Sequence, residues 1–157
     1  MKSKMTFAGV VIAMLCITSM LPLQAQAGQC SQASLAGMWD FTYSGTVFAP
    51  NPLPAAAVGH FKQDRAGNVT GRETFSLAGG AEQEDISGTV TVRPDCTGTA
   101  TVQVFLNGQL QRTSILAVTY DSDLKHGRAI FHSVTLPDGS NLPVVITFDA
   151  NRVFSSN

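Results

Sequence analysis

The stretch that decides the fold covers residues 85–106, DISGTVTVRPDCTGTATVQVFL. Apolar and polar residues alternate on both sides of the central RPDC, and the phrase GTxTV occurs at 88–92 and again at 98–102. Alternation with a period of two is typical of strands that bury one face, and proline and aspartate favour a turn. The stretch therefore predicts two antiparallel strands, 85–92 and 97–106, joined by a tight turn.

The same alternation recurs along the chain in short segments separated by Gly, Asn, Asp or Pro. The predicted strands are 38–46, 55–63, 69–77, 85–92, 97–106, 110–120, 128–136 and 142–149. Strands linked as sequential hairpins bury their apolar faces and lose both edges when the sheet closes on itself. We therefore expect an all-β fold, a single antiparallel up-and-down β-barrel of about eight strands. A two-sheet β-sandwich is the alternative.

Two connections are expected to be irregular. Segment 47–54, VFAPNPLP, contains three prolines, which cannot donate to a sheet ladder. We expect it to form a loop or lid near the mouth of the barrel. Segment 78–84, AGGAEQE, is expected to be a second loop.

The N-terminal region has the pattern of a secretion signal. Two lysines precede an apolar run over residues 7–23, and Ala25 and Ala27 have the small-residue spacing that signal peptidases read. We expect cleavage of residues 1–27, which leaves one domain, 28–157, exported to the periplasm or the extracellular space. A retained transmembrane anchor is the alternative. After cleavage no stable membrane anchor is expected.

The charge balance bears on partners. Without Lys2 and Lys4, eight of the ten basic residues remain against eleven acidic ones, a net charge of −3. Nucleic acids and anionic membrane surfaces recruit clustered lysine and arginine. No nucleic-acid partner is therefore expected.

Two cysteines remain outside the signal, Cys30 and Cys96. An even number in an exported chain predicts a disulfide, because those compartments are oxidising. A Cys-x-x-Cys spacing, typical of a redox or zinc site, is absent from the sequence. The three histidines share no ligand spacing either, so neither a metal nor a cofactor is expected.

The predicted inner faces supply the candidate site. The candidates for contact with a ligand are Trp39, Phe41, Tyr43, Phe61, Tyr120 and His132. Glu73 and His132 are the candidate catalytic pair, because a carboxylate and an imidazole in a dry cavity have displaced pKa values and can exchange protons. The alternative is structural: Glu73 near a rim or paired with an arginine, His132 hydrogen-bonded in the core, and the aromatic rings packed there.

Segment 35–41, LAGMWDF, resembles the Gly-x-Trp first-strand signature of lipocalins and their calycin relatives. In lipocalins an arginine packs across that tryptophan, and Arg152 follows the eighth predicted strand. A broader pattern, LAGxWxF, AVGxFxxDxxGNVTG at 57–71 and PDCTGTATV at 94–102, resembles uncharacterised secreted bacterial proteins. Those are thought to be barrels similar in shape to allene oxide cyclase. The resemblance implies a barrel and no particular activity.

Three functions are compatible with these patterns. The first, which we favour, is a non-enzymatic exported barrel that binds a small apolar or amphipathic molecule in its lumen. The second is a cyclase- or isomerase-like enzyme of the allene oxide cyclase barrel type, using Glu73 and His132. The third is a structural or adhesion module without a ligand.

Overall fold

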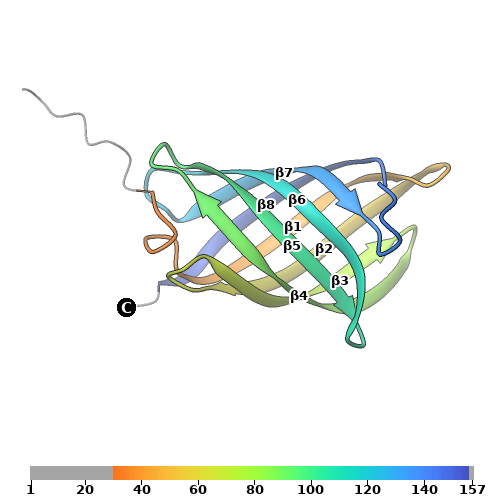
Figure 1. Ribbon diagram of the computed structural model, residues 1–157, viewed down its shortest axis with the longest axis horizontal. Coiled ribbons are helices and arrows are strands. Elements are labelled where there is room, and N and C mark those ends of the chain that lie inside the picture. Colours follow the sequence, from red (N-terminus) through yellow and green to blue (C-terminus); the bar gives the residue numbers. More distant parts are fainter. Residues whose placement is uncertain (1–29, 156–157) are drawn as a thin grey trace, which may run out of the picture.

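The structure, a computed structural model, describes residues 30–155 as a closed β-barrel. The strands are β1 (Gly37–Phe48), β2 (Pro52–Gln63), β3 (Asn68–Leu77), β4 (Gly80–Val92), β5 (Thr97–Leu106), β6 (Gln109–Tyr120), β7 (His126–Thr135) and β8 (Val144–Ser155). Each strand pairs antiparallel with the next, and β8 pairs with β1 (Figure 1). The predicted all-β up-and-down barrel is confirmed and the sandwich is excluded. The predicted signal, 1–27, lies outside the described residues.

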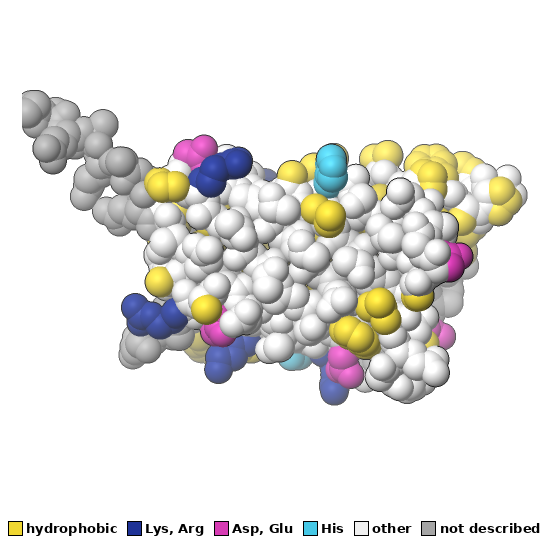
Figure 2. Space-filling view, in the orientation of Figure 1, with side chains coloured by type: hydrophobic (Ala, Val, Ile, Leu, Met, Phe, Trp, Pro, Cys, Tyr) yellow, Lys and Arg dark blue, Asp and Glu magenta, His cyan; other side chains and the backbone are white. Residues whose placement is uncertain are grey.

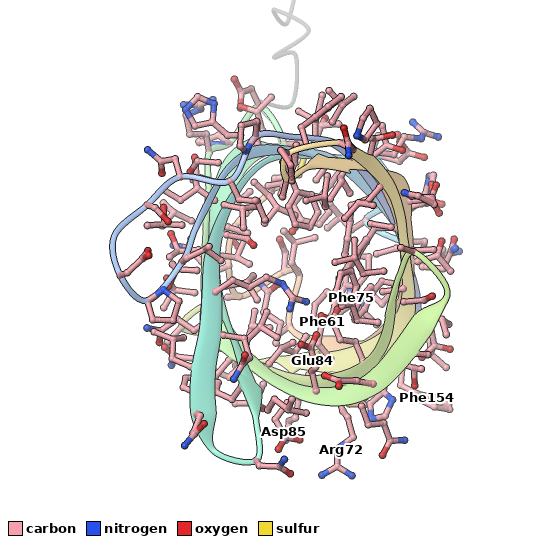
Figure 3. The ribbon with its side chains drawn as sticks, turned by 90° about the vertical axis from the view of Figure 1, so that its right-hand side faces the viewer. Phe61, Arg72, Phe75, Glu84, Asp85 and Phe154 are labelled. Carbon is pink, nitrogen blue, oxygen red and sulfur yellow. A yellow bond between two sulfur atoms is a disulfide. The ribbon has the colours of Figure 1, made fainter. Side chains whose placement is uncertain are left out.

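Alternation along the strands separates the lumen from the outer wall. Figure 3, seen from the right-hand end of Figure 1, shows Phe61, Phe75 and Glu84 inside the barrel and Arg72 and Asp85 outside. Burying one large apolar side chain stabilises a fold by about 1.5–3 kcal/mol. The inward aromatic and aliphatic residues therefore hold the barrel closed.

One end of the barrel is covered by the segment that precedes β1. Leu35 in this segment is fully buried, with 0% of its surface exposed. Cys30 forms a disulfide with Cys96 in the turn between β4 and β5, with their Cα atoms 5.1 Å apart. This confirms the predicted bridge, which fastens the covering segment to the barrel. We call this the closed end.

Trp39 anchors the closed end from inside. Its indole Nε1 donates to the carbonyl oxygen of Leu35 at 3.0 Å, and the Arg152 guanidinium lies 5.9 Å from the ring centroid. Arg152 also donates to the carbonyl oxygens of Ser34 and Ala36. The arginine–tryptophan contact implied by the resemblance is therefore present. Arg152 lies within β8, not after it, because β8 extends to Ser155.

The expected lid at 47–54 is wrong. β1 continues to Phe48 and β2 begins at Pro52, so only three residues connect them. The ladder between β2 and β3 begins at Ala55, and Pro52 and Pro54 lie beyond it. Proline is tolerated at such an edge because no donor is required on that side.

The expected loop at 78–84 is also wrong. β3 and β4 are joined by a two-residue turn, Ala78 and Gly79, with φ values of 50° and 95°. Positive φ at both positions matches the right-handed twist of a hairpin. Residues 80–84 therefore belong to β4, and Glu84 takes an inward position opposite Glu73.

A β-bulge in β7 reverses the alternation there. Phe131 and Ser133 pair with consecutive residues of β6, which leaves His132 without a ladder partner. Before the bulge Ile130 faces outward and is 50% exposed, whereas after it Val134 is buried. A single extra residue transfers every later side chain to the other face.

The pairing of β7 with β8 is the shortest ladder of the barrel. It covers only His126–Ile130 on β7, although the strand continues to Thr135. Beyond this ladder, the end of β7 is linked to the segment before β8 by an isolated bridge between Thr135 and Asn141. A hydrogen bond of 2.8 Å from Leu142 N to Val134 O adds to this link.

Candidate ligand-binding site

A cavity of about 500 Å³, the outer cavity, opens next to the β1–β2 and β3–β4 turns, at the end of the barrel opposite the disulfide. Its apolar wall comes mainly from Val47, Phe75, Leu77, Phe131, Val134, Leu136, Leu142, Val144 and Ile146. Its polar residues are Tyr43, Glu82, Glu84, Gln111 and Arg112. The volume lies within the range of about 300–1,000 Å³ typical of small-molecule sites.

The surface beside this mouth is apolar as well. Figure 2 shows hydrophobic side chains gathered at the hairpin between β1 and β2. Phe48 at this hairpin is 39% exposed, and Pro50, Pro52 and Pro54 are exposed beside it. An apolar ligand that approaches the mouth therefore meets an uncharged rim on this side.

A second cavity of about 70 Å³, the inner cavity, lies deeper in the lumen. Most of its lining is aromatic or aliphatic, with Phe41, Phe61, Tyr120, Leu116 and Phe148 among the residues. Its polar lining consists of Tyr43, Glu73, Arg112, Ser114 and Tyr120. The Ser114 Oγ is buried without a hydrogen-bond partner among the described residues. Since a water molecule needs only about 10–15 Å³ by this type of measure, the inner cavity has room for a small polar group.

A layer of polar side chains lies where the two cavities meet, and Tyr43 and Arg112 line both of them. Arg112 on β6 makes a two-pronged contact with Glu84 on β4, with Nη1–Oε1 at 2.9 Å and Nη2–Oε2 at 2.7 Å. The same Nη2 donates to Oε1 of Glu73 on β3 at 2.7 Å. Both carboxylates are 4% exposed. Bidentate salt bridges of this kind are strong and fix the orientation of the guanidinium.

Tyr43 and Phe75 complete this polar layer. The Tyr43 hydroxyl donates to Oε1 of Glu73 at 3.2 Å and accepts from Nη2 of Arg112 at 3.3 Å. The Arg112 guanidinium also lies 4.4 Å from the ring centroid of Phe75, a cation–π distance. Four strands, β1, β3, β4 and β6, therefore contribute to one buried network.

The polar layer contains two carboxyl groups, Glu73 and Glu84, but only one guanidinium, Arg112. Glu73 and Glu84 are direct partners across the β3–β4 ladder, where like charges repel. Burial is the main cause that raises the pKa of Glu73 from 4.5 to about 7, and Glu84 adds to it, while Arg112 opposes the rise. Glu73 is therefore a carboxyl group that exchanges its proton near neutral pH.

The pKa values of the tyrosines and of the arginine around this cavity are raised. Burial, and then the charge of Glu73, raise the pKa of Tyr43 far above its ordinary value. Burial lowers the pKa of Arg112, but the hydrogen bonds of Glu84 and the nearby anions outweigh this and raise it. Burial alone raises the pKa of Tyr120 to about 12. Of Glu73, Tyr43 and Arg112, Glu73 is therefore the group for which protonation changes charge near pH 7.

The structure distributes the predicted ligand contacts over different depths. Trp39 is fully buried at the closed end, where it stacks on Phe61 with ring centroids 6.2 Å apart. Phe41, Phe61 and Tyr120 line the inner cavity, and Tyr43 lines both cavities.

The expectation that His132 faces the lumen is wrong. It lies at the bulge of β7 and is exposed on the outer wall. Glu73 does face the lumen, so the proposed pair of Glu73 and His132 is not brought together. The bulge is the physical reason, since it changes the parity of the strand at that residue.

Arg112 and Glu84 were not predicted as site residues. Arg112 shares the parity of Tyr120, a candidate from the predicted inner faces, and this is the signal that the sequence offers. Glu84 shares the parity of Ile86, but its segment was expected to be a loop. The alternation pattern therefore contains an inward positive charge on β6 and an inward negative charge on β4.

Within residues 30–155 no three His, Cys, Asp or Glu side chains gather in a way that would hold a metal ion. Over the same residues, no helix has the length and hydropathy to span a membrane.

Similarity to known proteins is confined to the fold. No family model and no curated protein matches the chain. A structure of EF1p2_mFAP2b bound to DFHBI has a TM-score of 0.55 and 14% identity, covering 78% of this chain and 99% of that one. The redesigned β-barrel mFAP1, also bound to DFHBI, has a TM-score of 0.50 and 18% identity, with coverage of 78% and 98%. At such identities the likeness shows a shared barrel fold.

A third similar structure is that of the S-type phycobiliprotein lyase CPES from Guillardia theta. Its TM-score is 0.45 with 9% identity, covering 83% of this chain and 97% of that chain. We draw no argument from it. The class that the fold and site define is a small closed β-barrel with a lumen open at one end.

Proposed function

We propose that this protein binds one small amphipathic molecule in the outer cavity of its barrel. The observation that supports this most directly is the cavity of about 500 Å³, with an apolar wall and a polar floor made by Arg112, Glu84 and Tyr43. Such a site favours a ligand with an apolar body and one polar end, because burial of apolar surface supplies affinity and the polar groups fix orientation. That mFAP1 was solved with DFHBI bound shows that a barrel of this type can hold a small molecule.

The two other hypotheses have less support. An enzyme that uses Glu73 and His132 as acid and base would need them within reach of one substrate, and His132 lies on the outer wall. A module without a ligand would be expected to have a packed lumen, whereas both cavities lie inside this barrel.

We also propose that the protein acts outside the cytoplasm. The bond between Cys30 and Cys96 supports this, because disulfides persist in oxidising compartments and are rare in the reducing cytosol. Binding would then occur in the periplasm or the extracellular space.

The binding proposal is tested by blocking the outer cavity. Val144 lines the cavity, whereas its neighbour Val145 faces outward and is 60% exposed. We expect Val144→Trp to fill the cavity and to abolish binding of an uncharged apolar fluorescent dye such as N-phenyl-1-naphthylamine. Val145→Trp is the matched control and should bind the dye as the wild type does.

Thermal unfolding of both variants separates loss of binding from loss of fold. Undiminished dye binding by a folded Val144→Trp protein contradicts the proposal. Equal loss in both variants also contradicts it, since the outer wall would then matter as much as the cavity.

A further inference from the structure

The charge of the polar layer indicates which charge the polar end of the ligand would have. When Glu73 and Glu84 are both ionised, Arg112 neutralises only one of them, and one negative charge remains in the lumen. Glu82 adds a further carboxylate at the mouth. An anionic ligand would bring another negative charge to a guanidinium that is already paired twice. A cationic ligand would compensate the excess.

A second observation, independent of the acids, lies in the inner cavity. Ser114 lines this cavity, and only 2% of its surface is exposed. Its hydroxyl has no hydrogen-bond partner among the described residues. Leaving a buried hydroxyl unpaired costs about 1–3 kcal/mol, so such a group points to a bound partner. Glu73 and Tyr120 line the same cavity.

These groups match one chemical class. A primary ammonium has three N–H donors and no acceptor. Three groups of the inner cavity can accept from it: the Glu73 carboxylate, the Ser114 Oγ and the Tyr120 hydroxyl oxygen. Arg112 lines the same cavity, but its guanidinium is paired with Oε1 of Glu73 and with Glu84. The aromatic rings around it, including Phe41 and Phe131, favour a cation further.

We propose that the ligand is an amphipathic primary amine, with its ammonium group in the inner cavity beside Glu73 and Ser114 and its apolar chain in the outer cavity. This deepens the proposed function and rests on it. Binding involves no covalent step. The proton that leaves Glu73 on binding passes to solvent.

The surroundings of Glu73 define the pH dependence. The ionisable groups around it are Tyr43 from β1, Glu84 from β4 and Arg112 from β6, and the residue opposite it on β2 is Gly59. Because the pKa of Glu73 is about 7, the carboxyl must lose a proton to receive the ammonium below that pH. Affinity should rise by up to about tenfold per pH unit between pH 5 and 7 and become constant above.

The test compares three probes of equal chain length: octylamine, octanol and octanoate. With the disulfide intact, isothermal titration calorimetry at pH 8 should show octylamine binding about tenfold or more tighter than octanol, and octanoate weakest. Equal or tighter binding of octanol or octanoate overturns the amine inference and leaves the binding function intact. If none of the three binds, the proposed function fails with it.

Two variants locate the ammonium group. Ser114→Ala should weaken octylamine binding by about threefold to tenfold without lowering the melting temperature, because it removes a hydroxyl that has no partner in the protein. Ser44→Ala, on the exposed face of β1, is the matched control. Glu73→Gln should weaken octylamine about tenfold or more and remove its pH dependence, and it should weaken octanol much less than octylamine. Unchanged octylamine affinity in Ser114→Ala overturns the placement.

Discussion

The substitution Glu73→Gln should stabilise the folded protein above neutral pH. Glu73 is 4% exposed and its pKa is raised from 4.5 to about 7 by burial and by Glu84. The folded state thus holds a proton that the unfolded chain releases, and the free energy of unfolding falls as pH rises from about 4.5 to about 7. A shift of this size corresponds to ~3 kcal/mol, at about 1.4 kcal/mol per pKa unit.

Glutamine reproduces the shape of the protonated carboxyl and cannot ionise. Its side-chain oxygen can still accept from Arg112 and Tyr43. We therefore expect the variant to match the wild type near pH 5 and to exceed it by up to ~3 kcal/mol at pH 8, because the carboxylate no longer has to be desolvated.

Urea denaturation from pH 5 to 8 measures this difference, with the fluorescence of the single tryptophan, Trp39, as the signal. Asp85→Asn is the matched control, because Asp85 follows Glu84 on β4 but pairs with Arg72 on the outer wall. Its profile should stay parallel to that of the wild type. If the Glu73→Gln profile is parallel too, Glu73 ionises equally in both states and the account of the polar layer is wrong.

Two further predictions concern the closed end and the N-terminus. Replacing Cys30 and Cys96 together by serine should lower the free energy of unfolding by about 4 kcal/mol, the chain-entropy value for a separation of 66 residues, and an unchanged urea midpoint would contradict this. The mass of the protein recovered from outside the cytoplasm should correspond to a chain that begins at Gly28, and a mass that includes residues 1–27 would refute the predicted cleavage.

The architecture could be predicted because it depends on local alternation. Over residues 86–92 of β4 and 98–106 of β5 every second residue is apolar or small, and the next turn has Asn107 and Gly108, which tolerate positive φ. Alternation of this strength fixes which face is buried. Closure follows, since a meander with one apolar face has no other way to bury it and hide its edges.

The site could be predicted only in part because it depends on contacts between distant strands. Glu73 was identified from its parity, but its partner Arg112 lies 39 positions away and reaches it only across the closed barrel. Glu84 was missed because AGGAEQE has no apolar alternation to mark it as a strand. His132 was misplaced because a bulge adds one residue without any change in hydropathy.

The short ladder between β7 and β8 gives this cylinder an uneven stiffness. At the disulfide end, a covalent bond and the arginine–tryptophan contact prevent the walls from parting. At the mouth, the same walls are held across this one seam by a bridge and a few hydrogen bonds. Segments with the fewest backbone bonds open at the lowest free energy. We therefore expect the barrel to open locally along this seam at its mouth, while the disulfide end stays closed.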